Sequence, residues 1–359
     1  MGVCNSYNNK ENYILATFYI NDKNVNNDIR IINSSDQYKE NNVYKIEFND
    51  LKKYESNEAK IKDCEIYINN RLIPFNYFHK FNEIGEYIIK YKFNQILTNT
   101  SFMFAGCEYL TEIKLSNFIS KYVTDTSYMF FYCKSLAHLN FTNFDSSNVI
   151  YMNNMLDSCF SIVNLNLSHL NTQNVVDMSH MFESCILLSN LDLTNFNTKN
   201  VNKMNSMFCK SGIVNLNLSN FVTNRVIDMK NMFNGCFYLT NLNIENFCID
   251  EIIFLDDMFK GCSKLYLGNL NIGDINNGNK LKIVKELKNN LIQTLLEDEN
   301  SKSGLYRYSE NNRILVKEYE KFLFDLLKDR DSYAISLLGY EFEKKFHKLE
   351  KFINKLLNK

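Results

Sequence analysis

The cysteines of this sequence have the widest choice of chemistry, because thiols can form disulfides, bind zinc or act as nucleophiles. Six of the 10 recur at intervals of about 26 residues, with Ser211 filling one position of the series. Equivalent side chains in stacked repeats point in parallel, and the C-x-x-C pair common in zinc sites is absent. We therefore predict no metal and no cofactor, but a structural column of buried, reduced thiols. Its members are Cys107, Cys133, Cys159, Cys185, Cys236 and Cys262.

Other catalytic motifs are missing from the sequence. The five histidines fall at different phases of the repeat or outside it, and the H-E-x-x-H spacing does not occur. Glycine-rich phosphate-binding loops and the G-x-S-x-G nucleophile elbow are also absent. We therefore predict no catalytic residues and a protein that is not an enzyme. A regulatory or enzymatic activity in the C-terminal segment is an alternative.

Two columns of polar side chains could bind a ligand. They alternate with apolar residues in segments such as IVNLNLS (162–168), so they should face outward from a sheet. Such amide-rich columns suit a polar partner, but they could instead form a ladder of stacked amides, because the usual Trp, Tyr and Arg binding residues are absent there. The predicted interaction surface comprises Glu112, Lys114, His138, Asn140, Asn164, Asn166, Asn190, Asp192, Asn215, Asn217, Asn241 and Asn243.

The first residues, MGVCNS, carry a candidate lipidation signal. Gly2 and Ser6 match the N-myristoylation pattern M-G-x-x-x-[ST], and Cys4 offers a thiol for a second acyl chain. One myristoyl chain binds a membrane only marginally, at about 10⁴ M⁻¹, whereas two chains make attachment stable. We therefore predict lipidation at Gly2 and Cys4, on a flexible N-terminus of residues 1–11. A chance match to the pattern is the alternative.

A repeat defines the elements that position these residues. The pair Met-Phe, once Met-Leu, recurs at steps of 25 or 26 residues, and each repeat unit is called a coil below. Within a coil, strand-like alternation is followed by helix-like spacing, as at Val175, Met178 and Phe182. One coil cannot bury enough surface to offset its loss of conformational entropy, so the coils must stack. Coils 1 to 7 contain Met103, Met129, Met155, Met181, Met207, Met232 and Met258.

This repeat resembles the 26-residue leucine-rich repeats of the BspA-like surface-protein family, which occurs in bacteria and is expanded in unicellular eukaryotes. The block LDLTNFNTKNVNKMNSMF (191–208) carries the resemblance, which covers roughly residues 96–272. It implies a leucine-rich-repeat solenoid of about seven coils, with a parallel sheet and short helical turns, and a binding or adhesive role. The sequence departs from L-x-x-L-x-L-x-x-N-x-L because Asn195 follows Leu193 by two positions instead of three.

Two flanking segments complete the predicted fold class. A β-rich N-terminal cap domain is expected over residues 12–95, as a ubiquitin-like β-grasp or a small immunoglobulin-like sandwich, with hairpins at NDKNVNN and Asn69-Asn70. Apolar residues with alternating spacings of three and four predict an α-helical capping domain over residues 280–359. Such domains would cover the exposed ends of a repeat stack. The expected N-terminal strands are 14–20, 28–33, 64–69, 71–75 and 85–91.

Composition narrows the function further. The 359 residues carry 40 Lys and Arg against 41 Asp and Glu, so the net charge of −1 gives no field for nucleic acid. No run of about 20 apolar residues could cross a bilayer, and no secretory signal peptide is recognisable. We expect a non-enzymatic interaction scaffold with a protein partner, cytoplasmic and held at the membrane surface by acylation. An extracellular adhesin or surface antigen is the alternative, and a glycan ligand is expected only there.

Overall fold

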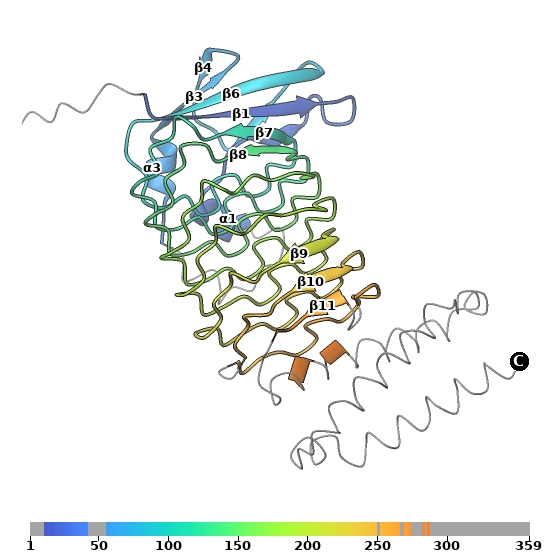
Figure 1. Ribbon diagram of the computed structural model, residues 1–359. Helices are drawn as coiled ribbons and strands as arrows, with labels where there is room; N and C mark the ends of the chain where they lie inside the picture. Colours follow the sequence, from blue (N-terminus) through green and yellow to red (C-terminus); the bar gives the residue numbers. More distant parts are fainter. Residues whose placement is uncertain are drawn as a thin grey trace, which may run out of the picture.

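The computed structural model describes most of the chain up to residue 273 (Figure 1). The candidate lipidation sites Gly2 and Cys4 lie outside the described residues, as does nearly all of the predicted helical domain 280–359. The described ranges are 11–41, 55–249, 252–265, 269–273, 282–283 and 286–287.

The N-terminal region is rich in strands. Strand β1 alternates buried with partly exposed residues, as its sequence YILATFYI predicts, and Ile14 and Phe18 are fully buried. It pairs antiparallel with β6 along its whole length. The elements are β1 (Tyr13–Ile20), β2 (Asp28–Arg30), α1 (Ser35–Asn41), α3 (Glu58–Lys62), β3 (Cys64–Ile68), β4 (Arg71–Ile73), β5 (Phe78–Lys80) and β6 (Gly85–Phe93).

One of the two predicted hairpins is present. Strands β3 and β4 are joined by Asn69 and Asn70, whose φ angles of 47° and 65° suit a tight two-residue turn. The hairpin predicted at NDKNVNN is wrong, because β2 pairs with β5 instead of β1. Strand β1 has no free edge for β2, since it bonds β6 on one side and β7 (Leu110–Lys114) of the first coil on the other.

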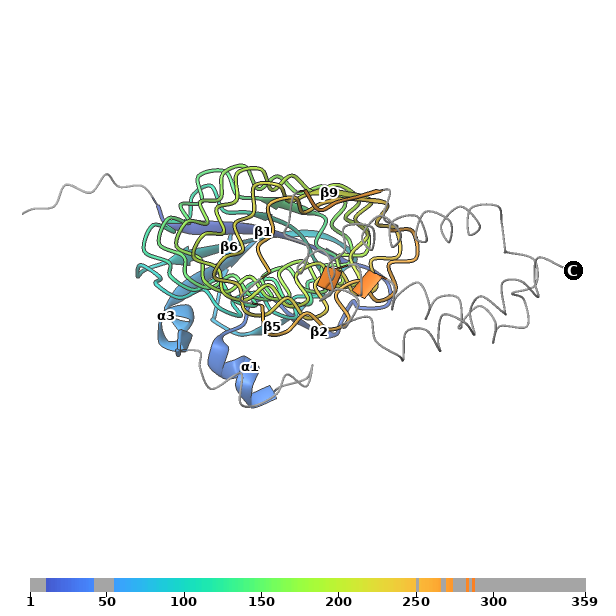
Figure 2. The same ribbon diagram turned by 60° about the horizontal axis from the view of Figure 1, so that its bottom comes forward.

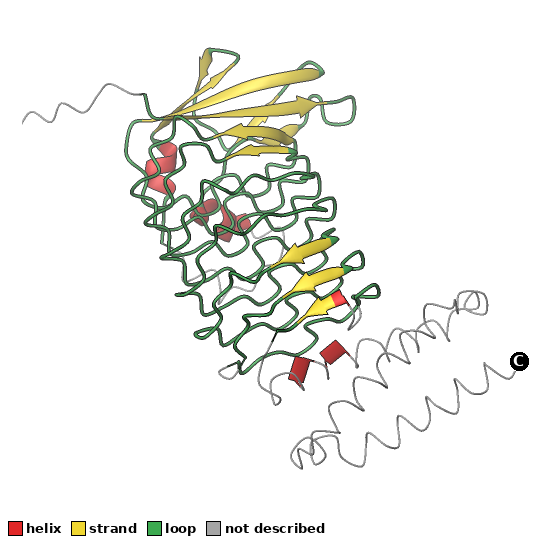
Figure 3. Cartoon of the chain, in the orientation of Figure 1, coloured by secondary structure: helices red, strands yellow, loops and turns green. Residues whose placement is uncertain are grey.

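After β6 the chain runs through the seven coils, which place short strands on one face. Neighbouring coils pair in parallel on this face, whereas β1 pairs antiparallel with the strand of coil 1. The N-terminal region and the first two coils therefore share one sheet, in the order β4-β3-β6-β1-β7-β8 (Figure 3). The coil strands are β7 (Leu110–Lys114), β8 (His138–Asn140), β9 (Asn215–Asn217), β10 (Asn241–Asn243) and β11 (Leu270–Asn271).

The coils stack in register at the spacing of the sequence repeat. Parallel bridges join residues 26 positions apart, such as Asp125 and Tyr151. We call the residues around the Met-Phe pair of a coil its Met-Phe segment. In each Met-Phe segment, alternate backbone N–H groups donate to carbonyls of the following coil, as Phe130 N does to Met155 O at 3.0 Å. Four such bonds, all in the same direction, cross each interface between coils. Seen more nearly from the end, the coils lie one behind another (Figure 2).

The fold class predicted from the sequence is wrong, because it placed a short helical turn in every coil and a parallel sheet beside these turns. The two helices bounded above both precede the coils, and the six-stranded sheet is mixed. Every fourth residue of a Met-Phe segment is left-handed, as His180 and Ser184 are with φ 57°, and this stops a right-handed helix after one turn. Nearly all residues of the expected C-terminal helices lie outside the described residues.

Stacking aligns equivalent side chains into a continuous core. Met, Phe, Leu and Val residues of successive coils are almost completely buried. The rings of Phe182, Phe208, Phe233 and Phe259 stack with centroids 5.6 to 5.7 Å apart and nearly parallel planes. Burying a side chain of this kind is worth about 1.5–3 kcal/mol, so contacts between coils supply most of the stability.

Candidate interaction surface

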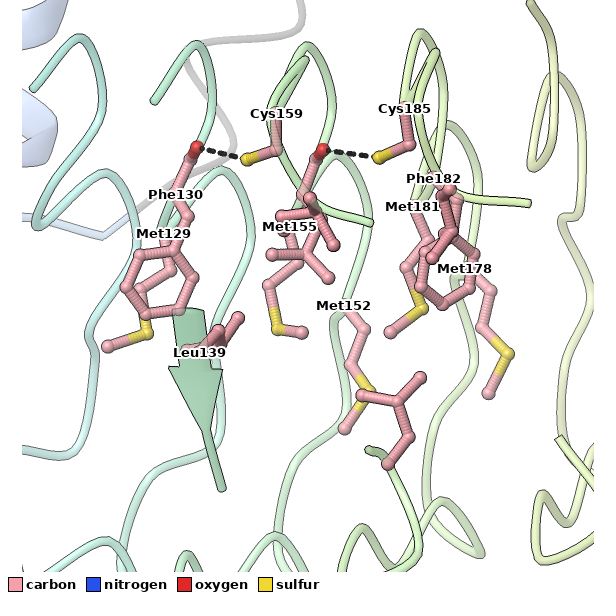
Figure 4. Packing of buried hydrophobic residues seen from close by; sticks show 14 of the residues in the cluster. Met129, Phe130, Leu139, Met152, Met155, Cys159, Met178, Met181, Phe182 and Cys185 are labelled. Carbon is pink, nitrogen blue, oxygen red and sulfur yellow. Dashed lines mark hydrogen bonds between the residues drawn. The ribbon is translucent and has the colours of Figure 1, made fainter. Parts of the chain in front are cut away.

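The six column cysteines lie inside the coil stack, and no disulfide joins them. Each is at most 1% exposed. From coil 2 onward, the column thiols donate to backbone carbonyls of the preceding coil: Cys159 Sγ lies 3.2 Å from Phe130 O, and Cys185 Sγ lies 3.2 Å from Leu156 O (Figure 4). Burial raises the pKa of Cys107 to about 12 and also raises the pKa of the next three column thiols. Burial and these contacts make Cys107, Cys133, Cys159 and Cys185 structural groups with little thiolate to react.

Brief alkylation of the native protein should therefore separate two classes of cysteine. We expect Cys248, which is partly exposed, to be modified first, while Cys133 and Cys159 react only after unfolding. Mass spectrometry of peptides from protein alkylated at about pH 8, with and without urea, measures this difference. Fast modification of Cys133 in the folded protein would show that the column is accessible.

The outward columns of the coil strands line a single groove of about 1260 Å³. Eleven of the 12 predicted surface residues border it; the exception, Lys114, forms an ion pair with Glu112, with Nζ and Oε1 3.1 Å apart. The groove extends from coil 1 to coil 7, along the side of the stack that carries β7 to β11 (Figure 1). We call it the amide groove, because asparagines are its principal lining residues. Glu112, His138 and Asp192 also line it, together with Asn140, Asn164, Asn166, Asn190, Asn215, Asn217, Asn241, Asn243, Asn269 and Asn271.

Four polar lining residues were not predicted from the sequence. Asn269 extends into coil 7 the first column, which consists of Glu112, His138, Asn164, Asn190, Asn215 and Asn241. Asn271 extends the second column, which consists of Lys114, Asn140, Asn166, Asp192, Asn217 and Asn243, and Thr142 and Thr194 follow members of this column by two positions. The segment N-L-N at 269–271 repeats the N-L-N at 241–243, so this match could have revealed the first two. The lost repeat pattern at YLGNLNIG (266–273) concealed it.

The second column of the groove closes a turn at the end of each strand. In each of its members from coil 2 onward, the side-chain Oδ1 accepts the backbone N–H two residues later, at 2.8 to 3.1 Å. Such an Asx turn satisfies a backbone donor that leaves the sheet. The Nδ2 groups of Asn140, Asn166 and Asn217 make no hydrogen bond with the described residues, so this column offers donors to a ligand. The turn-forming residues are Asn140, Asn166, Asp192, Asn217, Asn243 and Asn271.

The first column does not form the continuous amide ladder that the sequence left open as an alternative. Asn241 Nδ2 donates to Asn215 Oδ1 at 2.5 Å, but Asn190 Nδ2 contacts Ser189 Oγ of its own coil, at 3.3 Å. Among the described residues, the bond from Asn241 to Asn215 is the one hydrogen bond between side-chain amides of this column. A ladder would need such a hydrogen bond between each pair of neighbouring coils. Much of the hydrogen-bonding capacity of the column is therefore available to a ligand.

Asp192 places a negative charge in the middle of the groove. Its Oδ1 accepts the Thr194 backbone N–H at 3.0 Å and the Thr194 hydroxyl at 2.7 Å. These two bonds hold the pKa of Asp192 below its ordinary value, so the carboxylate stays charged at neutral pH. No Arg lines the groove, and the nearby Lys114 is already paired with Glu112. The charge balance disfavours an anionic ligand such as nucleic acid.

A second polar cluster lies in the Met-Phe segments of coils 3 to 5. His180 Nδ1 lies 2.5 Å from Glu183 Oε2, and Asn205 Nδ2 lies 3.0 Å from His180 Nε2. Burial, together with the charge of Glu183, raises the pKa of Asp157 to about 7. The described residues include no group of three His, Cys, Asp or Glu side chains arranged to hold a metal ion. Nor do they include a helix long and apolar enough to cross a bilayer.

Comparisons with known proteins bear on the repeat region. A family model described as "Mycoplasma protein of unknown function, DUF285" matches residues 75–190 and again residues 177–290, which together make up more than half of the chain. No curated protein matches. Among solved structures, a leucine-rich repeat protein from Bacteroides ovatus ATCC 8483 is 16% identical, with a TM-score of 0.18. The match covers 49% of this chain and 58% of that protein, and a TM-score this low transfers neither fold nor function.

Proposed function

We propose, on the premise that this chain belongs to the DUF285 family, that it is a non-enzymatic interaction scaffold that binds its partner in the amide groove. The amide groove carries the proposal. It spans all seven coils, and its Asn side chains keep unused hydrogen-bonding groups while the interior of the stack is closely packed. Exposed polar groups with unused donors and acceptors can bind a ligand without loss to the core. The resemblance to BspA-like surface proteins also supports a binding role.

A blocked groove tests the proposal. Asn190 and Asn215 are neighbours in the first column, so the double variant Asn190→Tyr with Asn215→Tyr would fill the middle of the groove. The probes are a phage-displayed library of random peptides and a glycan array. Probes that bind the wild-type protein should lose at least about tenfold in affinity for the blocked variant.

A matched control places the same side chains elsewhere on the same coils. Gln173 and Lys199 are exposed, lie 26 positions apart and do not line the groove. The double variant Gln173→Tyr with Lys199→Tyr should therefore bind each probe as the wild-type protein does. If the selected probes bound the blocked variant and the control equally well, the groove would not be the binding surface.

The attachment of this scaffold to membranes is a separate proposal, and it rests on the first residues of the sequence. We propose acylation at Gly2 and Cys4, which would keep the protein at the cytoplasmic face of a membrane. Protein purified from its own cells should carry both acyl chains by intact mass, and Gly2→Ala should move it from the membrane fraction to the soluble fraction. Cys4→Ser should weaken attachment without removing the first chain. An unmodified terminus would favour the extracellular adhesin instead.

A further inference from the structure

Two departures from the repeat occur near one another at the amide groove, in coils 4 to 6. The first is Asp192, since the equivalent residues of coils 2, 3, 5, 6 and 7 are asparagines. Asn166 and Asn217 form the same turn that Asp192 forms, so the fold does not need a carboxylate there. Asp192 Oδ2 makes no hydrogen bond or ion pair with any described residue. The fold therefore does not require the negative charge of Asp192, and its Oδ2 atom can bind another molecule.

The second departure is the residue missing from coil 5, at Gly212. A Cβ atom at this position would lie 2.2 Å from Ile186 O, so the backbone of coil 5 presses against coil 4 and no side chain fits there. Gly212 N donates to Cys185 O at 3.0 Å, which fixes this close approach. Gly212 itself thus places no side chain between coils 4 and 6.

Large apolar side chains are exposed on both sides of Gly212. Ile186 and Leu187 of coil 4 are 50% and 52% exposed, and Phe237 and Tyr238 of coil 6 are 57% and 54% exposed. Four such side chains, two on each of the coils that flank coil 5, make an apolar surface of the kind that marks a contact site. The corresponding residues of coil 7, Ser263 and Lys264, are polar, so the repeat does not require apolar residues here. We call these four residues the rim patch.

The rim patch borders the amide groove. Leu187 precedes the groove residue Asn190 by three positions, and Tyr238 precedes Asn241 by three, which limits each separation to about 11 Å along the chain. Asp192 follows Leu187 by five positions, which limits their separation to about 17 Å. A partner in the groove can therefore reach both the carboxylate and the rim patch. The patch also supplies the large apolar contacts that the groove lacks.

We propose that the amide groove binds an extended polypeptide segment that places a Lys or Arg side chain at Asp192 and a large apolar side chain on the rim patch. This inference rests on the proposed function of the groove. Asn side chains can donate to the main-chain carbonyls of such a segment, and the Asp192 carboxylate complements a cation. A neutral glycan would leave the Asp192 charge unpaired. The expected spacing between the basic and the apolar residue is about five positions, because an extended segment covers about 17 Å in five residues.

Peptides selected from the random library test this inference through variants that copy other coils. Asp192→Asn copies Asn166 and Asn217, Leu187→Ser copies Ser161, and Phe237→Ser copies Ser263, so each should fold. We expect the selected peptides to be enriched in a basic and a large apolar residue about five positions apart. Asp192→Asn should weaken their binding at least about fivefold, and Leu187→Ser or Phe237→Ser at least about tenfold. Added salt should weaken binding to the wild type more than to Asp192→Asn.

Matched controls come from the outer turns, away from the groove. Asp145 is exposed and forms the same kind of turn, with Oδ1 accepting Ser147 N at 3.0 Å, and Val222 is 43% exposed at the equivalent position of coil 5. Asp145→Asn and Val222→Ser should leave peptide affinity unchanged.

The possible failures separate this inference from the proposed function. Peptides that lose binding to the blocked variant, yet show no basic or apolar preference and ignore Asp192→Asn, would overturn the inference alone. The same holds if the wild-type protein selects no peptide and binds a glycan only through the groove. Peptides that bind the blocked variant as well as the wild type would overturn the proposed function, and the inference with it.

Discussion

Replacing Asn33 by Ala is expected to lower the free energy of unfolding by about 2–5 kcal/mol. Asn33 is 1% exposed, and it bonds to the backbone of coil 1 on the side where no earlier coil lies. Its backbone N–H donates to Met103 O at 2.7 Å, and its Nδ2 donates to Ala105 O at 2.8 Å. The side-chain Oδ1 accepts Ser34 N at 2.9 Å. Truncation would leave a carbonyl and an N–H unpaired in the interior.

The later coils show why this contact matters. Each carbonyl equivalent to Met103 O accepts an N–H from the coil before it, as Met129 O accepts Phe104 N at 2.9 Å. Coil 1 has no coil before it, so Asn33 and Asn57 supply donors instead. Asn57 Nδ2 bonds Ser101 O at 2.8 Å. These amides thus stand in for the backbone of a missing coil.

Urea unfolding of Asn33→Ala, Asn57→Ala and a control measures the effect. In the control, Asn148→Ala, the lost bond joins Nδ2 to Lys121 O at 2.7 Å, but it is exposed, and water can replace it. We expect a loss below about 1 kcal/mol for the control and at least about 2 kcal/mol for each buried amide. Equal losses in all three variants would show that the buried amides do not close the coil stack.

Replacing Asp157 by Asn is expected to stabilise the protein above neutral pH. Asp157 is 8% exposed, and its carboxylate accepts hydrogen bonds from Asn154 Nδ2 at 3.0 Å and Ser158 Oγ at 2.8 Å. Burial, and then the charge of Glu183, raise its pKa to about 7. An amide has the shape of the protonated acid and can keep both contacts, since the Ser158 hydroxyl can also accept.

The sign of the pH dependence follows from the raised pKa. The folded state holds the Asp157 proton up to about pH 7, whereas the unfolded chain releases it near its ordinary value of 3.8. The stabilisation from this group is therefore complete at low pH and is lost as the pH rises through about 7. Between pH 5 and pH 8 the loss from this group is about 2–3 kcal/mol, and Asp157→Asn should lack it.

Unfolding free energies at pH 5 and pH 8 provide the measurement. His180 adds a decline of the same sign: burial lowers its pKa, but the hydrogen bond and charge of Glu183, with the charges of Asp157 and Asp177, raise it overall. A smaller slope should therefore persist in Asp157→Asn. In the control, Asp145→Asn, the wild-type pKa is lowered by bonds from Ser147, so the slope between pH 5 and pH 8 should not change. An unchanged slope in Asp157→Asn would show that the buried carboxyl is already ionised at pH 5.

The periodic parts of the structure were largely accessible from the sequence. The 26-residue spacing predicted which side chains share a column, and strand alternation predicted 11 of the residues that line the groove. Periodicity misled at Val175, Met178 and Phe182, because helix-like spacing arises equally well from consecutive tight turns with left-handed residues such as His180. The spacing of buried residues shows which side chains face the core, but it does not fix the backbone conformation.

The features without a period could not be predicted. Asn33 and Asn57 are two of many asparagines, and their importance comes from carbonyls of coil 1 that lie more than 40 positions away. The pairing of β2 with β5 likewise depends on both edges of β1 being occupied. The rim patch was also missed, because its residues stand out only when neighbouring coils are compared in three dimensions.

The common direction of the bonds in the Met-Phe segments gives this side of the stack an electrical polarity. Peptide dipoles aligned head to tail add together, as they do in a helix, so partial negative charge gathers toward coil 1 and partial positive charge toward coil 7. The amide donors of Asn33 and Asn57 meet the negative pole. Near the opposite pole lie two adjacent acids, Asp256 and Asp257, whose carboxylates offset a positive potential. The charged and polar groups at the two ends of this side of the stack are thus of the sign that complements its backbone dipole.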